Sequence, residues 1–289
     1  MTLEDQDLQL LTRCACAAAR AAGHFIATAR PSNIQHKAGL TGASQVVTNV
    51  DREAEERILQ ELAPTIERFD LGVLSEERAD DRSRLDKEFF WCIDPLDGTL
   101  PFIEGVPGYA VSIALVSHSG RPEIGAVFDP VHQTLYSATR GLGMRRNGRP
   151  WQRVANARGE TLSVFCDRSL LARPDYADIL AGLQEIARDM GLRSAEVYSD
   201  AGAVMNACQA LDNAPACYFK FPKPGIGGGS LWDFAATACF FREAGAIASD
   251  IHGAPLALNR VESTYMNHSG VVYATSAELA ERVRGLYLP

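Results

Sequence analysis

The segment Trp91-Cys92-Ile93-Asp94-Pro95-Leu96-Asp97-Gly98-Thr99 decides the fold expected for this chain. The first three residues of this segment belong to the apolar run Phe89–Ile93, which has the length and composition of a buried strand. Two carboxylates follow, three residues apart, and Pro95 restricts the backbone between them, so we expect a turn. Gly98 can adopt backbone angles denied to other residues, so its amide and that of Thr99 can point together at an anion. A buried strand therefore delivers two acids and an anion-binding turn to one place.

Further acids also follow apolar or glycine-rich segments. Glu76 comes after the apolar run 71–74, and Asp233 opens a predicted helix after the glycines at 227–229. Carboxylates that converge in a cleft repel one another strongly unless cations neutralise them. Carboxylate and carbonyl oxygens, here including the carbonyl of Leu96, are the ligands that Mg²⁺ prefers. Together with Asp94 and Asp97, these acids form a candidate metal centre.

Each of these acids also has a purely structural interpretation. Asp-Pro and Asp-Gly pairs are common turn and cap residues, which would account for Asp94 and Asp97. Ser230 and Asp233 have the spacing of a helix capping box, and Thr48 and Asp51 share that spacing. Spacing alone does not choose between capping and metal binding.

The chain divides into two differently patterned halves. Before residue 152 it has helical runs at 8–26 and from 49, then strands that end in the hairpin signal Asn147-Gly148. After that point strands alternate with helices, as in α/β proteins. Because 289 residues exceed the usual size of one core, we expect two subdomains, residues 1–152 and 153–289. The first is α+β and carries most metal ligands; the second is α/β and carries Asp233.

Composition excludes several classes of function. The net charge is -8, and the basic residues are scattered, so a surface for a nucleic-acid polymer is not expected. No apolar run approaches the roughly 20 residues that cross a bilayer. The N-terminus is acidic at Glu4, Asp5 and Asp7, which argues against a secretory signal. The seven cysteines lie mainly in apolar segments and form no C-x-x-C pair, so we expect reduced thiols and a cytoplasmic protein.

The run Asp94-Pro95-Leu96-Asp97-Gly98-Thr99 resembles the signature of the inositol monophosphatase superfamily, which are metal-dependent, lithium-sensitive phosphomonoesterases. The resemblance extends in the same order to Lys37, Val47-Thr48 with Asp51, Ser75-Glu76-Glu77, Phe102-Ile103, Asp129-Pro130, residues 141–148, Trp232-Asp233 and Glu243-Ala244-Gly245. It implies a mixed α/β fold in an α-β-α-β-α layered sandwich of the inositol monophosphatase and fructose-1,6-bisphosphatase type. It also implies a homodimer and an active site between the two halves.

The resemblance also assigns roles. The Mg²⁺ ions, two or three in number and with Mn²⁺ as a substitute, would be held by Glu76, Asp94, Asp97, Asp233 and the carbonyl of Leu96. The amides of Gly98 and Thr99 would bind the phosphate. Thr99 and Asp51 would orient and deprotonate the attacking water, with Glu76 assisting.

The spacing of the acids distinguishes this site from another phosphatase class. Haloacid-dehalogenase phosphatases use a D-x-D-G-T motif, whose acids are two residues apart, and they form an aspartyl phosphoenzyme. Here Asp94 and Asp97 are three residues apart, so a covalent intermediate is not expected. The expected mechanism is therefore direct hydrolysis by a water molecule that a metal ion activates.

The choice of substrate is less defined. Related inositol phosphatases tend to carry a glutamate seven residues before the last metal aspartate, and this chain has Ile226 there, unless the glycine-rich loop is offset. Lys220 and Lys223 precede that loop; they could contact a phosphate, or they could be solvated surface residues. Lys37 could likewise contact the phosphate or water. Leu100 follows Thr99, where bisphosphate nucleotidases often have a lysine.

We therefore expect a Mg²⁺-dependent hydrolase of a small phosphate monoester, a phosphorylated polyol or sugar. A 3'(2'),5'-bisphosphate nucleotidase that acts on adenosine 3',5'-bisphosphate is the alternative within enzymes. A catalytically silent regulator that binds metal or phosphate is the alternative of another class; the acids at all four ligand positions, with Thr99 and Asp51, argue against it.

Overall fold

The computed structural model describes residues 3–30, 35–36, 46–47, 49–154 and 159–288. Its helices are α1 (Asp5–Thr28), α2 (Asn49–Phe69), α3 (Thr99–Glu104), α4 (Arg168–Leu171), α5 (Tyr176–Asp189), α6 (Ala203–Asp212), α7 (Leu231–Glu243) and α8 (Ala277–Arg284). Its strands are β1 (Gln35–His36), β2 (Val46–Val47), β3 (Gly72–Ser75), β4 (Phe89–Asp97), β5 (Ala110–Ser117), β6 (Pro122–Asp129), β7 (Thr134–Thr139), β8 (Gly143–Arg146), β9 (Arg149–Pro150), β10 (Thr161–Phe165), β11 (Ser194–Tyr198), β12 (Ala216–Lys220), β13 (Ile247–Ser249) and β14 (Val271–Ala274).

Most strands belong to one of two sheets. The first sheet has the order β3-β4-β5-β6-β7-β8-β9, with β3 parallel to β4 and the other pairs antiparallel. The second sheet has the order β11-β10-β12-β14-β13, with its first three strands parallel. The first sheet thus comes from residues 72–150 and the second from residues 161–274.

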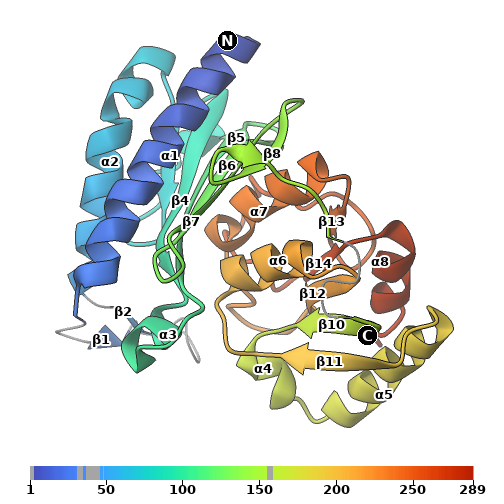
Figure 1. Cartoon of the computed structure of the whole chain (residues 1–289). Helices are drawn as coiled ribbons and strands as arrows, with labels where there is room; N and C mark the ends of the chain where they lie inside the picture. The colour runs from blue at the N-terminus through green and yellow to red at the C-terminus, as the bar shows by residue number, and fades with distance from the viewer. Residues whose placement is uncertain (1–2, 31–34, 37–45, 48, 155–158, 289) are drawn as a thin grey trace.

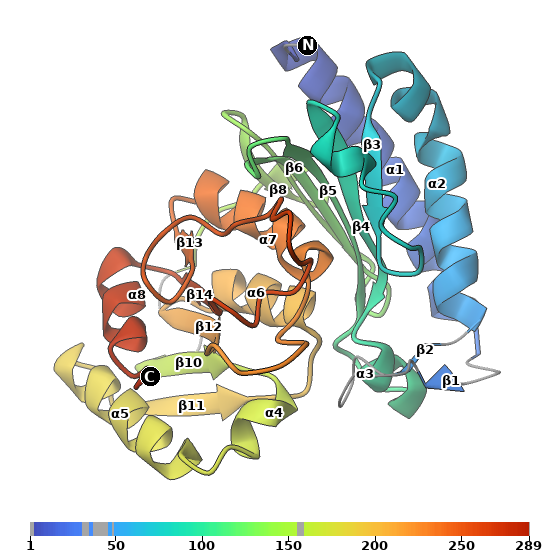
Figure 2. The same cartoon turned by 180° about the vertical axis from the view of Figure 1, so that it is seen from behind.

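Helices and sheets alternate in five layers (Figures 1 and 2). Helices α1 and α2 cover the outer face of the first sheet, and α6 and α7 lie between the sheets. Helices α5 and α8 cover the far face of the second sheet. This is the α-β-α-β-α sandwich expected from the sequence, and that prediction is confirmed.

The layering explains why the central strands are apolar throughout. All residues of β5 are buried, because α1 packs on one face of this strand and α7 on the other. A strand covered on both faces needs a continuous apolar run rather than alternation. The acids that end β4 are therefore introduced into an interior between layers, where few solvent molecules can screen them.

The structure confirms the Asn147-Gly148 hairpin and corrects the expected turn at Pro95. Asn147 and Gly148 have φ of 51° and 76° and connect β8 to β9, as a tight hairpin requires. Around Pro95, however, β4 continues to Asp97 with a β-bulge between Asp94 and Asp97. A bulge re-aims side chains along a strand that remains paired. Helix α3, which the sequence reading omitted, begins directly after Gly98.

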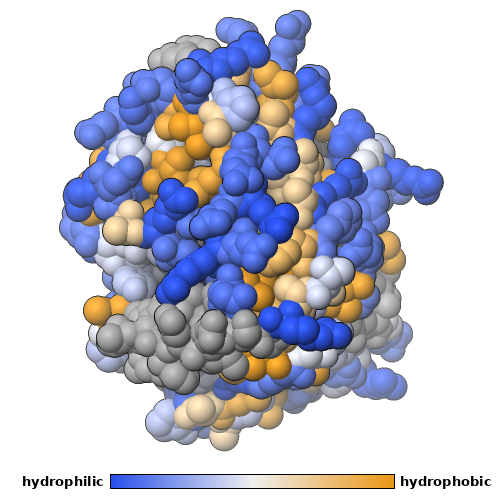
Figure 3. Space-filling model, turned by 90° about the vertical axis from the view of Figure 1, so that its left-hand side faces the viewer, coloured by the Kyte–Doolittle hydropathy of each residue, from blue (hydrophilic) through white to orange (hydrophobic). Residues whose placement is uncertain are grey.

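The outer helical layer presents a mostly hydrophilic face with scattered apolar patches (Figure 3). This agrees with the burial of α1, whose Leu8, Leu11 and Ile26 point inward. Among the described residues, no helix has both the length and the hydropathy needed to cross a bilayer.

Candidate active site

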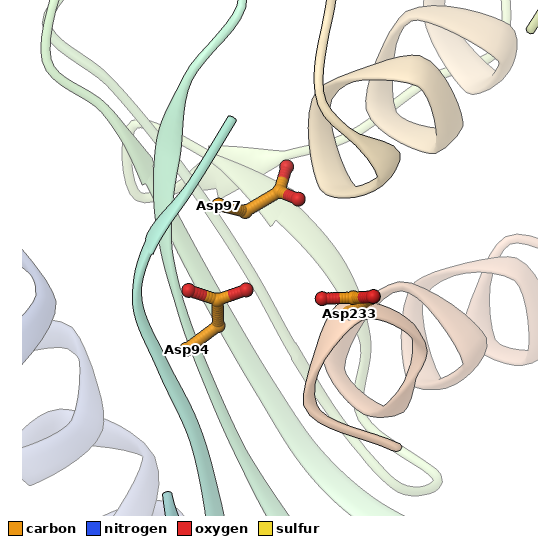
Figure 4. A group of neighbouring side chains, drawn as sticks. All are labelled: Asp94, Asp97 and Asp233. Carbon is orange, nitrogen blue, oxygen red and sulfur yellow. The ribbon is translucent and has the colours of Figure 1, made fainter. Parts of the chain in front are cut away.

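Three carboxylates lie close together between the two sheets: those of Asp94 and Asp97 project from β4, and that of Asp233 projects toward them from the opposite side (Figure 4). Asp94 and Asp97 come from the bulged end of β4, and Asp233 comes from the first turn of α7. Each offers one oxygen, and these oxygens lie within 4.8 Å of one another. Residues more than 130 positions apart in the chain thus meet at one point, as the sequence reading expected for a metal centre.

Backbone amides fix the orientation of the two acids of β4. Asp94 Oδ1 accepts a hydrogen bond from the amide of Leu96 at 3.0 Å. Asp97 accepts from Ala203 N at 3.1 Å and Val204 N at 2.9 Å, at the start of α6. Two free amides and the positive end of a helix dipole stabilise this carboxylate in its charged form.

Glycine at position 202 makes this close approach possible. A Cβ at Gly202 would lie 2.3 Å from Asp97 Oδ2, which is far inside van der Waals contact. Its amide also donates to the carbonyl of Gly108 at 2.8 Å. The absence of a side chain at Gly202 therefore brings the start of α6 against the end of β4.

Asp233 caps α7 and also faces the other two acids. Its Oδ2 accepts a hydrogen bond from Ser230 N at 2.8 Å, and Ser230 completes the capping box of α7. The capping bond fixes the rotamer of Asp233, and the carboxylate still faces Asp94 and Asp97 (Figure 4). The structural interpretation thus explains the orientation of this acid without excluding metal binding.

Glu76 lies beside these acids because β3 runs parallel to β4. Ser75 pairs in register with Ile93, so Glu76, which follows β3, lies beside the segment of β4 that begins with Asp94. The amide of Glu76 donates to the carbonyl of Ile93 at 3.2 Å. The negative charge of Glu76 raises the pKa of Asp94.

The acids are in electrostatic conflict without a cation. Burial raises the pKa of Asp94 well above its usual range, and the charges of Glu76, Asp97 and Asp233 raise it further. Burial and the charge of Asp233 likewise raise the pKa of Asp97. Burial raises the pKa of Asp233, although Lys220 opposes that change. A buried group of this kind favours either protons or bound cations.

The donor set fits a hard divalent cation. The candidate ligands are carboxylate oxygens together with the carbonyl of Leu96, whose residue is buried beside Asp94 and Asp97. All-oxygen sites suit Mg²⁺ and Mn²⁺ rather than softer metals.

Asp51 and Thr99 form a pair next to this group. Asp51, at the start of α2, is 2% exposed. The Thr99 hydroxyl lies 3.3 Å from Asp51 Oδ1 and 3.2 Å from the carbonyl of Leu96, and can donate its one hydrogen to either. Gly98 has φ of 82° and precedes α3, so the left-handed conformation that the sequence reading required is present.

Lys220 also faces the acids, and sequence reasoning missed its partner. Its ammonium lies 2.6 Å from Asp167 Oδ2, and both side chains are largely buried. Burial disfavours the ammonium, but the charges of Asp167 and Asp233 outweigh that cost and raise the pKa of Lys220. Asp167 lies just beyond strand β10, after the buried residue Cys166. The rule that places an acid at the end of an apolar run, which found Glu76 and Asp94, would therefore have found Asp167 too.

The remaining candidates lie elsewhere. Lys223 is exposed in the loop after β12, where its amide donates to the carbonyl of Asn267 at 2.9 Å. Ile226, seven residues before Asp233, is 59% exposed in the same loop. The position where related inositol phosphatases tend to carry a glutamate therefore does not lie among the acids when it is counted along the sequence. Lys37 and Thr48 lie outside the described residues.

Comparison with known proteins places this geometry in context. The model of a family described as "Inositol monophosphatase family" matches residues 7–286. The Nus factor SuhB of Vibrio cholerae is 32% identical over 239 residues, covering 82% of this chain and 83% of that protein. The inositol-1-monophosphatase of Mesorhizobium japonicum is 31% identical over 214 residues, covering 74% and 75%. The structure of inositol monophosphatase from Anabaena superposes with a TM-score of 0.71 at 23% identity, covering 97% and 96% of the two chains.

Proposed function

Because the chain belongs to the inositol monophosphatase family, we propose that it is a Mg²⁺-dependent hydrolase of a small phosphorylated polyol or sugar. The observation that carries the proposal is the convergence of Asp94, Asp97 and Asp233 within 4.8 Å in a buried position. Burial and mutual repulsion disfavour the charged form of these acids, and bound cations would relieve both effects. Phosphate monoesters are substrates that divalent cations activate. A phosphatase of this superfamily follows from the family; the metal and the substrate are our proposal.

Each residue has a proposed part. Glu76, Asp94, Asp97, Asp233 and the carbonyl of Leu96 hold two or three Mg²⁺ ions, for which Mn²⁺ can substitute. When bound there, Mg²⁺ would supply positive charge that neutralises the phosphate and makes water more acidic. The amides of Gly98 and Thr99 bind phosphate oxygens.

Asp51 and Thr99 act on the attacking water. Thr99 Oγ1 accepts a hydrogen bond from the water while it donates its own hydrogen to Asp51, which is buried and close enough at 3.3 Å. The water oxygen bonds to phosphorus, the bond from phosphorus to the alcohol oxygen breaks, and the alcohol leaves with a proton that originates from water. No residue is phosphorylated on this route.

Two other candidates have specific support. The buried ammonium of Lys220 near the acids suits a substrate with two phosphates, as in the 3'(2'),5'-bisphosphate nucleotidases. Lys223 and Lys37 are further candidates for phosphate contacts. A catalytically silent regulator is suggested by relatives that are named Nus factor, but the acids and the Asp51–Thr99 pair that catalysis requires are all present here.

Expectations about the cellular context also remain proposals. We propose a homodimer in the cytoplasm, sensitive to lithium, with the subdomain boundary near residue 152. All seven cysteines are free thiols, which supports a reducing compartment. Light scattering of the purified protein tests the dimer.

A phosphate-release panel tests the function. The substrates are inositol 1-phosphate, fructose 1,6-bisphosphate, histidinol phosphate and adenosine 3',5'-bisphosphate, each with Mg²⁺ and with a chelator. We expect release from at least one, abolished by the chelator and by Asp94→Asn. If well-folded protein with Mg²⁺ released no phosphate from any of them, the silent regulator would replace the hydrolase.

A further inference from the structure

Lys220 is directed into the layer between the sheets by the alternation of side chains along β12. Tyr218 packs in the apolar cluster around α6 and α7, whereas Phe219 packs in the outer cluster with residues of α5 and α8. Residues two apart on a strand share a face, so Lys220 lies on the face of Tyr218. The same end of β12 brings its ammonium toward Asp233 in the first turn of α7 and toward Asp97 at the end of β4, and the charges of both act on it.

The ammonium is held there by several contacts. Asp167 Oδ2 lies 2.6 Å from Nζ, and the ring centroid of Phe234 lies 5.4 Å from it. Asp167 Oδ1 also accepts hydrogen bonds from the Tyr218 hydroxyl at 3.2 Å and from Asn206 Nδ2 at 3.3 Å. The side chain of Lys220 is 16% exposed. A lysine fixed in this manner is not a solvated surface residue, because burial of an ammonium requires such partners.

Lys220 lies on one side of the acids, and Asp51 and Thr99, the pair proposed to act on the attacking water, lie on the other. Asp51 comes from α2, which packs on the outer face of the first sheet, whereas Lys220 comes from the second sheet (Figures 1 and 2). In-line displacement places the leaving group opposite the attacking water. The side that carries Lys220 and Asp167 therefore faces the leaving group of the substrate.

We propose that Lys220 is a specificity-determining residue that selects leaving groups with a second anionic group, and that Asp167 is its positioning residue. The inference rests on the proposed phosphatase function. The ammonium has three N–H donors, so it can keep Asp167 and bind a phosphate or carboxylate of the substrate. Hydrogen bonds between two charged groups are stronger than those to a neutral hydroxyl, so a simple polyol gains less.

Matched substrate pairs test this with the Mg²⁺-loaded full-length protein. Adenosine 3',5'-bisphosphate and adenosine 3'-monophosphate differ by a second phosphate; 3-phosphoglycerate and glycerol 3-phosphate differ by a carboxylate. The measured quantity is the ratio of kcat/KM within each pair, because a general folding defect lowers both members equally. Lys220→Gln and Asp167→Asn are compared with Lys87→Gln, which removes a lysine that pairs with Asp70 on the surface.

For wild type, we expect kcat/KM to be higher for the substrate with the second anionic group in at least one pair. The pair that shows this preference tells whether the second group that Lys220 binds is a phosphate or a carboxylate. Lys220→Gln should lower this ratio about tenfold, mostly through KM, as loss of a charged hydrogen bond predicts. Asp167→Asn should lower it less, and Lys87→Gln should leave it unchanged. Hydrolysis with no preference in either pair, or a ratio unaffected by Lys220→Gln, overturns the inference and leaves the phosphatase standing. If the protein hydrolyses neither these substrates nor those of the phosphate-release panel, the role of Lys220 and the proposed phosphatase function are both overturned.

Discussion

Replacing Asp94 by Asn should stabilise the metal-free protein and abolish its stabilisation by metal. At an effective dielectric constant of about 20, two like charges 4.8 Å apart repel by about 3.5 kcal/mol. In the wild type, partial protonation of the acids already removes some of this repulsion. We therefore expect the substitution to raise the free energy of unfolding of the metal-free protein by about 2 kcal/mol near neutral pH. The introduced amide keeps an oxygen that can accept from the Leu96 backbone N–H, and its NH₂ group can donate to the nearby carboxylate of Asp233. For a chain of 289 residues, with an unfolding entropy of about 2.1 cal/mol/K per residue, this gain raises Tm by about 3 °C.

The pH dependence of this gain has a definite sign. The pKa of Asp94 in the folded, metal-free protein is raised above that of the unfolded chain by burial and by neighbouring acids. Protonation of Asp94 therefore stabilises the folded wild-type protein. This stabilisation is complete below about pH 4, the usual pKa of an aspartate in an unfolded chain, and it is lost as the pH rises through the raised pKa of the folded state. The difference in Tm between Asp94→Asn and wild type should therefore grow from about pH 4 toward neutrality.

Thermal unfolding followed by circular dichroism measures both effects. With a chelator the variant should unfold at a higher temperature than wild type; with excess Mg²⁺ the wild type should gain stability by mass action and the variant should not. Asp178→Asn, an exposed acid of α5, is the control and should change little in either condition. A lower Tm for metal-free Asp94→Asn would refute the reasoning, because the acids would then not be in conflict.

Three further substitutions give sharp outcomes. Thr99→Ala should lower kcat about a hundredfold with nearly unchanged Mg²⁺ affinity, measured by steady-state kinetics and calorimetric titration, and a large loss of affinity would reassign Thr99 as a ligand. Gly202→Ala should weaken Mg²⁺ binding at least tenfold in the same titration, because its Cβ displaces Asp97; unchanged affinity would show that Asp97 has another position available. Arg84→Met should lower the free energy of unfolding in urea by about 3 kcal/mol, because Arg84 is 1% exposed and bonds Asp80 and Asn259 at 2.9 and 2.7 Å; a loss under about 1 kcal/mol would contradict this.

The sequence was sufficient wherever a local rule decides where a side chain lies. An acid directly after a buried strand ends at a sheet edge, and this rule placed Glu76 beside Asp94. The capping spacing placed Asp233 in the first turn of α7, and the hairpin dipeptide at 147–148 formed as expected. Asp167 lies one residue further from its strand, after the buried Cys166, and the same rule could have found it when Cys166 is counted with the apolar run.

Other features depend on contacts that no local pattern records. Asp97 is held by amides more than 100 residues away, and only the packing of α6 against β4 brings them together. Lys220 reaches the acids because strand register fixes it, whereas a residue count along the loop pointed to Ile226, which is exposed. The bulge at Pro95 replaced a turn because pairing with β5 resumes at Asp97. Tertiary pairing overrode the local preference at that position.

The most direct test is an anomalous difference map from a crystal soaked in Mn²⁺. We predict at least one strong peak enclosed by the carboxylates of Asp94, Asp97 and Asp233, and its loss in a crystal of Asp94→Asn. A well-ordered wild-type crystal in which these side chains point apart, or in which no peak lies among them, would contradict the account.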